Sequence, residues 1–300
     1  MPTSSRILIS GASGLIGTAL VPTLEARGFS ISRLVRRRGS GYTDVEWDPT
    51  NPLRPELVSD FDAVIHLAGE PVTGLWTDAK RARISNSRVL GTEHLAEALA
   101  KTNQPPRVFI SGSATGYYGD RGDEVLREDS PSGEGFLPEV CRQWEVATKP
   151  AEEARIRTVQ IRTGIVLSAE GGALQAMLPN FKLGLGGKIG NGRQWMSWIH
   201  MQDHIGAIHH ILDHELVQGP VNLVAPLPVR NSEFTETLAK ALSRPAVFGV
   251  PAFALRLILG EMAKELLLAS QRVEPAKLGG SEYQFQYQDL PSALQNILRD

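Results

Sequence analysis

A glycine-rich turn near the start of the chain limits the possible folds more than any other feature. Gly11, Gly14 and Gly17 follow the apolar run Ile7-Leu8-Ile9 and open a stretch of helical periodicity at residues 15–27. The first glycine permits a tight turn, the second lets the backbone approach a pyrophosphate, and the third lets the helix pack on the strand. Free N–H groups at the helix start attract phosphates. The spacing predicts a dinucleotide-binding unit.

Short apolar runs then alternate with helical stretches. We expect strands at residues 6–10, 30–35, 63–68, 107–111, 158–161, 165–167, 196–200 and 220–224, and helices at 15–27, 79–101, 203–214, 231–242, 251–259 and 261–268. This alternation predicts an α/β fold, a Rossmann-type doubly wound parallel sheet with helices on both faces. We place an NAD(P)-binding domain at 1–168, with a sheet that 196–224 can complete. A small α+β substrate domain follows at 169–300.

Composition narrows the class of partner. The chain has 31 basic and 33 acidic residues, so 31 − 33 gives a net charge of −2, and 42 % of its residues are apolar. This balance gives no electrostatic reason to expect nucleic acid. No apolar run approaches the ~18 residues of a membrane helix, so we expect no membrane partner. A single cysteine, Cys141, fits a reducing compartment, and we expect a cytoplasmic protein.

The histidines do not predict a metal site. His210 and His214 stand at the i, i+4 spacing that can hold a metal, but no glutamate base lies between them in the metalloprotease pattern. A half-exposed helix face explains them more simply, with Asp213 as a local partner. We expect no metal.

The basic run that follows the second strand bears on the choice of cofactor. An acid at this point accepts hydrogen bonds from the ribose of NAD, whereas an arginine pairs with the 2′-phosphate of NADP. The chain has Arg36, Arg37 and Arg38 here and no acid. A solvated basic loop is the alternative. We predict NADP(H), because arginine suits fork-like contact with phosphate.

Further motifs resemble the extended, epimerase-like branch of the short-chain dehydrogenase/reductase superfamily. Besides the glycine turn they comprise Asp-Ala-Val-Ile-His-Leu-Ala-Gly at 62–69, the serine-rich segment 109–119, Ile-Arg-Thr-Gly-Ile-Val-Leu at 161–167 and Trp-Ile-His-Met-Gln-Asp at 198–203. Together with Leu-Gly-Leu-Gly-Gly at 183–187, they resemble an atypical subgroup named epimerase family proteins. Some members carry the name cell-division inhibitor or nucleoside-diphosphate sugar epimerase. Residues 250–285 resemble the subgroup's small C-terminal domain of unknown function.

The resemblance implies a set of cofactor contacts and a homodimer, since this superfamily often pairs through its long helices. The expected cofactor-binding residues are Gly11, Ser13, Gly14, Leu15, Ile16, Arg36, Arg37, His66, Leu67, Ala68, Gly69, Glu70, Arg88, Ser111, Arg162, Gly164 and Val166.

The catalytic signature of the superfamily is missing. Active members carry Tyr-x-x-x-Lys, in which the tyrosine is the acid/base and the lysine lowers its pKa. Counting back from Glu145 places Leu137 at the tyrosine position and Cys141 at the lysine position. Leucine cannot move a proton. We interpret Cys141 as a small buried hydrophobe rather than a nucleophile.

Other residues are candidates for the missing roles. Ser113, Tyr117 and Tyr118 follow the expected fourth strand of the sheet and are the catalytic candidates. Tyr118 has an equally good interpretation as a packing residue. Arg88 can replace the lost lysine charge, or can form a salt bridge on the helix surface.

Two function classes remain open. The first is an NADP-dependent oxidoreductase or epimerase acting on a small polar substrate, for which a nucleotide sugar is a candidate. The second is a catalytically silent NADP(H)-binding regulatory protein. We expect residues 255–268 to pack within the small domain rather than lie on a membrane, because Glu261 and Glu265 stand among their polar residues and the segment carries little positive charge.

Overall fold

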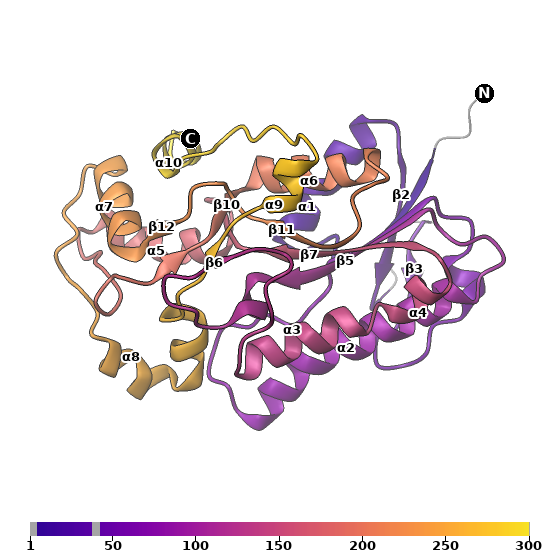
Figure 1. Ribbon diagram of the computed structural model, residues 1–300, viewed down its shortest axis with the longest axis horizontal. Helices are drawn as coiled ribbons and strands as arrows, with labels where there is room; N and C mark the ends of the chain where they lie inside the picture. Colours follow the sequence, from indigo (N-terminus) through magenta and orange to yellow (C-terminus); the bar gives the residue numbers. More distant parts are fainter. Residues whose placement is uncertain (1–4, 38–42, 300) are drawn as a thin grey trace.

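Seven parallel strands form the central sheet, in the order β11-β7-β5-β4-β1-β2-β3 (Figure 1). The structure is a computed structural model and describes residues 5–37 and 43–299. The strands of this sheet are β1 (Arg6–Ser10), β2 (Ser30–Val35), β3 (Val45–Glu46), β4 (Ala63–His66), β5 (Val108–Ala114), β7 (Arg157–Thr163) and β11 (Gly219–Leu223). The chain reverses its direction of winding between β1 and β4, which creates the crevice where ligands of such sheets bind. The predicted Rossmann-type α/β class is confirmed.

Helices cover both faces of the sheet because successive residues of its central strands are apolar, so that apolar side chains point to both faces. Ile7 and Ile9 of β1 pack in one cluster with residues of α1 and α6, whereas Leu8 packs in a second cluster with residues of α2 and α4. The five helices around the sheet are α1 (Leu15–Ala26), α2 (Asp78–Ala100), α3 (Phe136–Val146), α4 (Lys149–Glu153) and α6 (Met201–Asp213). Figure 1 shows α2, α3 and α4 together on one side.

The second half of the chain builds a smaller lobe at the carboxyl ends of the strands (Figure 1). Trp198, Phe181 and Phe234 belong to its buried cluster. Its short strands pair β8 with β10, β9 with β12 and β6 with β13. The remaining elements are β6 (Val125–Leu126), β8 (Ile165–Leu167), β9 (Trp195–Met196), β10 (Trp198–His200), β12 (Val229–Arg230), β13 (Arg272–Val273), α5 (Gly172–Lys182), α7 (Asn231–Ala241), α8 (Ala252–Leu259), α9 (Ala276–Gly280), α10 (Leu290–Ile297), the 3₁₀ helices η1 (Pro55–Val58) and η2 (Thr115–Tyr118), and the π-helix η3 (Ala263–Leu267).

Two of the expected strands, one on each side of residue 168, belong to different sheets in the structure. Residues 165–167 form β8, which leaves the central sheet and pairs with β10. Gly164 allows this departure, because a Cβ there would lie 2.5 Å from the carbonyl oxygen of Ser197. Residues 219–223 form β11, which returns to the central sheet beside β7. The sheet is therefore completed by a strand from the second half of the chain, while the domain boundary at 168 stays a prediction.

A buried carboxylate fastens the C-terminal segment to helix α6. Asp203 is fully buried and its side chain accepts hydrogen bonds from the backbone N–H groups of Gln286 and Tyr287, at 2.7 and 2.9 Å. The hydroxyl of Tyr283 donates to its backbone carbonyl at 2.9 Å. The aspartate of the 198–203 motif is thus an anchor between two distant parts of the chain.

Candidate functional site

The glycine turn lies at the carboxyl ends of β1 and β4, where the two strands are in register at Ser10 and His66. Gly11 has a φ of +73°, and a Cβ there would lie 2.7 Å from the carbonyl carbon of Leu67. Gly17 is equally constrained, since its Cβ would lie 2.3 Å from the carbonyl oxygen of Gly11. Only glycine fits these positions without displacing the backbone. The turn therefore brings the start of α1 close against β1 and β4.

The N-terminus of α1 is free to receive an anion. Gly14 is the N-cap residue, no side chain caps the helix, and no acid stands in its first turn. The first N–H groups of a helix have no partner within the helix. At Gly14 a Cβ would meet only the carbonyl oxygen of Gly11, at 3.3 Å, so space remains open beside the turn. Ser13 is exposed at the same turn. This is the geometry of a pyrophosphate site.

Two exposed arginines follow β2 directly. Arg36 and Arg37 make no ion pair with any residue in the described ranges, and Arg38 lies outside those ranges. β2 pairs with β1 in parallel, so the carboxyl end of β2 lies on the same side as the glycine turn, which follows the carboxyl end of β1. The pair can reach an anionic group at the adenosine end of a dinucleotide.

His66 is an uncharged support for the turn. It is buried, its Nδ1 lies 2.6 Å from the Oγ of Ser10, and that Oγ accepts from the N–H of Ala68 at 3.3 Å. Burial lowers the pKa of His66 to about 4. The imidazole is therefore neutral at physiological pH and holds the 67–70 turn in place.

Arg88 brings a positive charge to this turn from helix α2. Its guanidinium carbon would lie 3.2 Å from a Cβ at Gly69, and Nη1 donates to the carbonyl oxygen of Glu70 at 2.8 Å. It also lies 5.1 Å from the ring centroid of Trp144. The Glu70 carboxylate pairs with Lys80 and Arg83 instead. Arg88 has no carboxylate partner in the described part of the chain, and burial lowers its pKa.

The positions expected for the tyrosine and the lysine lie on α3, against η2. At Gly116 of η2 a Cβ would lie 3.6 Å from the Cβ of Leu137 and 3.7 Å from the Sγ of Cys141. Burial raises the pKa of the Cys141 thiol to about 12, which keeps it protonated. Arg88 is close enough to oppose that rise. The structure thus brings together a leucine, a neutral thiol and the guanidinium of Arg88 where active relatives of the superfamily place tyrosine and lysine.

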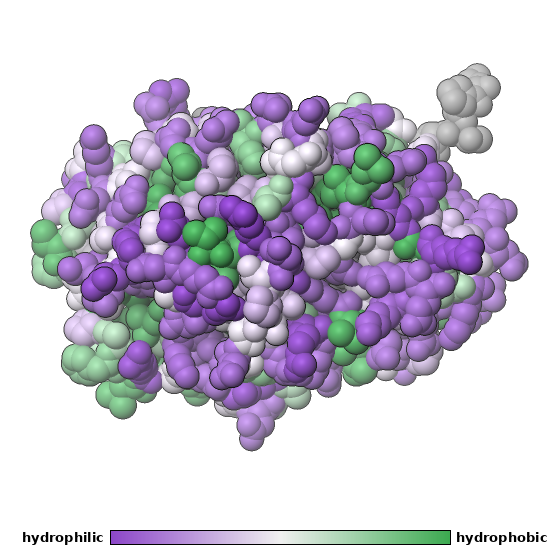
Figure 2. Space-filling view, viewed as in Figure 1, coloured by the Kyte–Doolittle hydropathy of each residue, from purple (hydrophilic) through white to green (hydrophobic). Residues whose placement is uncertain are grey.

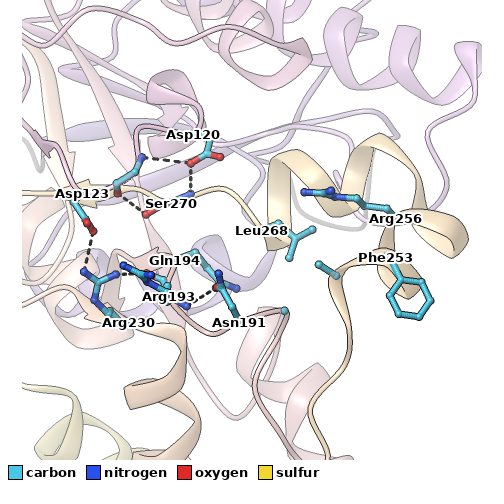
Figure 3. Close-up of a pocket in the computed structure, with 13 residues that line it drawn as sticks. Asp120, Asp123, Asn191, Arg193, Gln194, Arg230, Phe253, Arg256, Leu268 and Ser270 are labelled. Carbon is cyan, nitrogen blue, oxygen red and sulfur yellow. Dashed lines mark hydrogen bonds and ion pairs between the residues drawn. The ribbon is translucent and has the colours of Figure 1, made fainter.

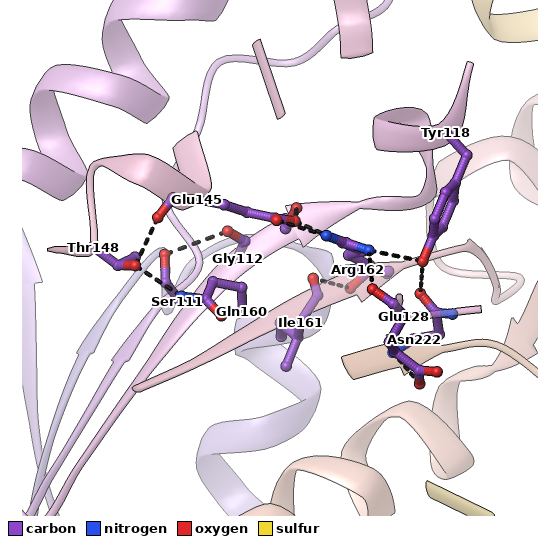
Figure 4. A network of polar contacts seen from close by, with 12 residues as sticks. Ser111, Gly112, Tyr118, Glu128, Glu145, Thr148, Gln160, Ile161, Arg162 and Asn222 are labelled. Carbon is purple, nitrogen blue, oxygen red and sulfur yellow. Dashed lines mark hydrogen bonds and ion pairs between the residues drawn. The ribbon is translucent and has the colours of Figure 1, made fainter. Parts of the chain in front are cut away.

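A buried polar network occupies the ends of β5 and β7 (Figure 4). Arg162 donates through Nε and Nη2 to both carboxylate oxygens of Glu145, each at 2.8 Å, and through Nη1 to the hydroxyl of Tyr118 at 2.9 Å. Ser113 donates to Glu145 at 2.7 Å. Burial by itself would lower the pKa of Arg162, but the bond to Glu145 outweighs it and raises the pKa. The guanidinium is therefore committed to protein partners.

Tyr118 is committed in the same way. Its side chain is fully buried, and the single proton of its hydroxyl has two acceptors within reach, Asn222 Oδ1 at 2.7 Å and the carbonyl oxygen of Arg127 at 3.0 Å. Burial raises its pKa to about 12. By contrast, Tyr117 is half-buried, its ring lies 3.6 Å from the guanidinium carbon of Arg162, and its hydroxyl bonds to none of the described residues. Of the two tyrosines, only Tyr117 has a hydroxyl free for a ligand.

The network contains residues that sequence reasoning missed. Glu145, Asn222 and Glu128 hold Arg162 and Tyr118 in place, and Glu128 Oε1 accepts from the N–H groups of Asn222 and Lys277. Glu128 is buried, and its Oε2 has no hydrogen-bond partner in the described chain. Glu145 lies on helix α3, and nothing in the sequence around it indicates that its carboxylate pairs with Arg162 on strand β7.

A cavity of about 610 Å³ opens in the smaller lobe, between the 120–123 turn and helix α8 (Figure 3). Figure 3 shows Arg230 directed toward Asp123, which it pairs with at 2.9 Å, and Arg193 next to it. The lining comes from the 120–123 turn, the glycine-rich 190–194 segment, helix α8 and the 268–270 segment. Polar groups of both charges therefore face a space large enough for a small polar molecule.

The fold and the glycine turn define a nucleotide-binding α/β protein. Comparison with known proteins carries this further: residues 7–224 match the NAD dependent epimerase/dehydratase family, and residues 250–297 match a domain of unknown function (DUF1731). The chain belongs to this epimerase/dehydratase family. Its resemblance to the atypical epimerase family subgroup is confirmed.

Similar proteins span most of the chain. An epimerase family protein of Mycobacterium leprae is 39 % identical, over 96 % of this chain and 94 % of its own length. The solved structure of human epimerase family protein SDR39U1 with NADPH has a TM-score of 0.90 at 34 % identity, covering 98 % of this chain and 99 % of that one. A nucleoside-diphosphate sugar epimerase from Corynebacterium glutamicum gives 0.81 at 38 % identity, covering 99 % of this chain and 58 % of that one.

Proposed function

We propose that this chain is an NADP(H)-dependent oxidoreductase or epimerase acting on a small polar substrate. The observation that carries the proposal is that two positive groups without an acidic partner in the described chain lie together at the carboxyl ends of the parallel strands. One is the uncapped N-terminus of α1, and the other is the unpaired guanidinium of Arg88, next to Gly69. A half-buried cation without an anionic partner is costly in a free protein, so its presence points to a bound anionic ligand.

The choice of NADP(H) over NAD(H) rests on Arg36 and Arg37. Both are exposed at the end of β2 and neither is engaged by a described carboxylate. A 2′-phosphate would give them charge-assisted hydrogen bonds that a ribose hydroxyl cannot. The human relative solved with NADPH, at 34 % identity, supports the same choice.

The chain's own groups suggest how a reaction is carried out. The nicotinamide, when bound, supplies or accepts a hydride. We assign Arg88 the positive charge that lysine provides in active members of the superfamily. Among the three catalytic candidates, only Tyr117 has a hydroxyl unengaged by any described residue with which to donate or accept a proton, because the hydroxyls of Ser113 and Tyr118 are engaged with Glu145 and with Asn222 and Arg162. The backbone at Gly164 and Val166, rather than the Arg162 side chain, is left to contact the cofactor.

A nucleotide sugar is the substrate class we favour. The relative from Corynebacterium glutamicum carries that activity in its name at 38 % identity. The cavity beside α8 contains Arg193, which suits a diphosphate and forms no ion pair with a described residue.

A catalytically silent NADP(H)-binding regulator is the second candidate. Leu137 and Cys141 at the tyrosine and lysine positions favour it, since neither moves a proton at neutral pH. A separate polar cavity, lined in part by Arg193 and Asp120, argues for turnover, because a sensor of nucleotide alone needs no second pocket.

The first experiment is calorimetric titration of the purified chain with NADPH and with NADH. We expect NADPH to bind at least about tenfold more tightly, and Arg36→Ala/Arg37→Ala to lose about ten- to hundredfold for NADPH alone. Arg107→Ala is the matched control. Arg107 lies at the amino-terminal end of strand β5, on the side away from the glycine turn, and its side chain is 70 % exposed.

Turnover is then tested by following NADPH oxidation with a panel of nucleotide sugars, and by product analysis for epimers. Substrate-dependent turnover that Tyr117→Phe abolishes supports the enzyme. Tight NADPH binding with no turnover on any compound supports the regulator. Absence of binding to either nucleotide refutes both.

A further inference from the structure

Helix α8 (Ala252–Leu259) lies outside every hydrophobic core of the described chain. None of its eight residues is buried, although its sequence is Ala-Phe-Ala-Leu-Arg-Leu-Ile-Leu. Phe253 is 73 % exposed, Leu257 84 % and Ile258 69 %. The expectation that residues 255–268 pack within the small domain is wrong for this helix, and holds only further along, where Met262 and Ala263 are buried. Exposed apolar groups gathered in this way mark an interaction surface.

Two neighbouring segments extend the same surface. The 183–190 and 247–250 segments run side by side, with Phe248 N–H donating to the carbonyl oxygen of Gly186 and Val250 N–H to that of Lys188. They expose four more large apolar side chains. The apolar face, as we define it, consists of Leu183, Leu185, Val247, Phe248, Phe253, Leu257 and Ile258. Figure 2 shows apolar residues gathered at the α8 corner of the molecule.

Positive charges accompany the apolar face. Five exposed cations lie within six residues of its members in the chain, and none of them forms an ion pair with a residue in the described ranges: Lys182, Lys188, Arg244, Arg256 and Lys264. The acids of this segment are engaged elsewhere. Glu261 pairs with Arg81, and Glu265 accepts from the N–H groups of Phe136 and Leu137. The face is therefore apolar with an unneutralised positive rim.

This combination decides between occupants. A second copy, docked through the same face about a twofold axis, would bring two positive rims together, and like charges across an interface oppose association. A bilayer containing anionic lipids suits both features. Apolar side chains enter the boundary between headgroups and acyl chains, and lysines and arginines meet the phosphates.

We propose that the apolar face docks reversibly on anionic membrane surfaces, with α8 lying in the plane of the interface. No helix in residues 5–37 and 43–299 is long and apolar enough to cross a bilayer, so this contact is peripheral. It departs from the expectation of no membrane partner, which rested on the lack of a membrane-spanning apolar run, and from the expectation that residues 255–268 carry too little positive charge for a membrane surface. Phe253 and Arg256 also line the cavity beside α8, so docking places the mouth of that cavity next to the lipid.

Vesicle co-sedimentation of the full chain tests the proposal. We expect binding to vesicles of phosphatidylcholine mixed with phosphatidylglycerol, little binding to phosphatidylcholine alone, and release as ionic strength rises. Phe253→Asp/Leu257→Asp should weaken binding at least about tenfold, because two large apolar side chains no longer enter the lipid. Leu216→Asp is the matched control: Leu216 is 96 % exposed, but lies between α6 and β11, away from the face.

Two outcomes overturn the proposal. One is the absence of binding to the anionic vesicles, or binding that the double variant does not weaken. The other is a concentration-dependent dimer in light scattering without lipid that Phe253→Asp/Leu257→Asp dissociates, which would assign the face to a second copy. Circular dichroism and NADPH titration of each variant report folding independently of lipid. The proposal does not rest on the enzymatic function.

Discussion

Arg88 is a cation that the free protein leaves unneutralised. Its guanidinium donates to the carbonyl oxygens of Glu70 and Ile84 and forms no ion pair in the described chain. Replacing an uncompensated buried charge with an apolar residue is often neutral or stabilising. We therefore predict that Arg88→Met lowers NADPH affinity about tenfold or more, yet leaves the free energy of unfolding of the nucleotide-free protein unchanged or raised. Calorimetry and thermal denaturation measure the two effects. A large loss of stability with unchanged NADPH affinity would show that Arg88 stabilises the fold and does not bind the nucleotide.

At the scale of single residues, sequence reasoning works where a motif dictates its own geometry. Gly11 and Gly17 were predictable because their roles follow from neighbours a few positions away. Arg162 was assigned to the cofactor from its motif, but its side chain pairs with Glu145 on another element. Tyr118 likewise bonds to Asn222, which is 104 residues away in the chain. Such partners depend on tertiary contacts, which no local pattern records.

At the scale of elements, the contact between α1 and β1 depends on Gly17. A Cβ there would lie 2.3 Å from one backbone oxygen and 2.6 Å from the Cα of Ala12, and neither can yield as a flexible side chain can. We predict that Gly17→Ala costs about 2 kcal/mol or more of stability and also weakens NADPH binding, since α1 must retreat from the turn. Gly14→Ala is the control, because its Cβ would meet a single atom at 3.3 Å. Chemical denaturation that ranks the two variants equally would contradict this account.

Helix α8 shows why an element can be predicted without its role. The sequence predicted a helix at residues 251–259, and the structure has one at Ala252–Leu259. An apolar helix looks the same in sequence whether its partner is the protein core or a surface outside the molecule. Only the exposed fractions of Phe253 and Leu257 separate the two cases. For the same reason, the sequence could suggest that a later strand completes the sheet, but the position of β11 next to β7 came from the structure.

The whole molecule carries a pH dependence that no single site would show. Burial lowers the pKa of His66, His200 and His204 to about 4, against an ordinary value near 6.5. These histidines take up protons on unfolding. Above pH 6.5 this uptake does not lower the free energy of unfolding, but the free energy of unfolding falls progressively as pH drops from 6.5 toward 4. With three such groups the unfolding free energy should change by up to about 4 kcal/mol per pH unit near pH 5. His204→Gln should remove the contribution of one of the three histidines to that slope, as measured by denaturant unfolding across this range. Carboxylates with lowered pKa, such as Glu70, add their effect only at lower pH, so a flat profile between pH 6.5 and 5 would mean that the histidines are protonated in the folded protein.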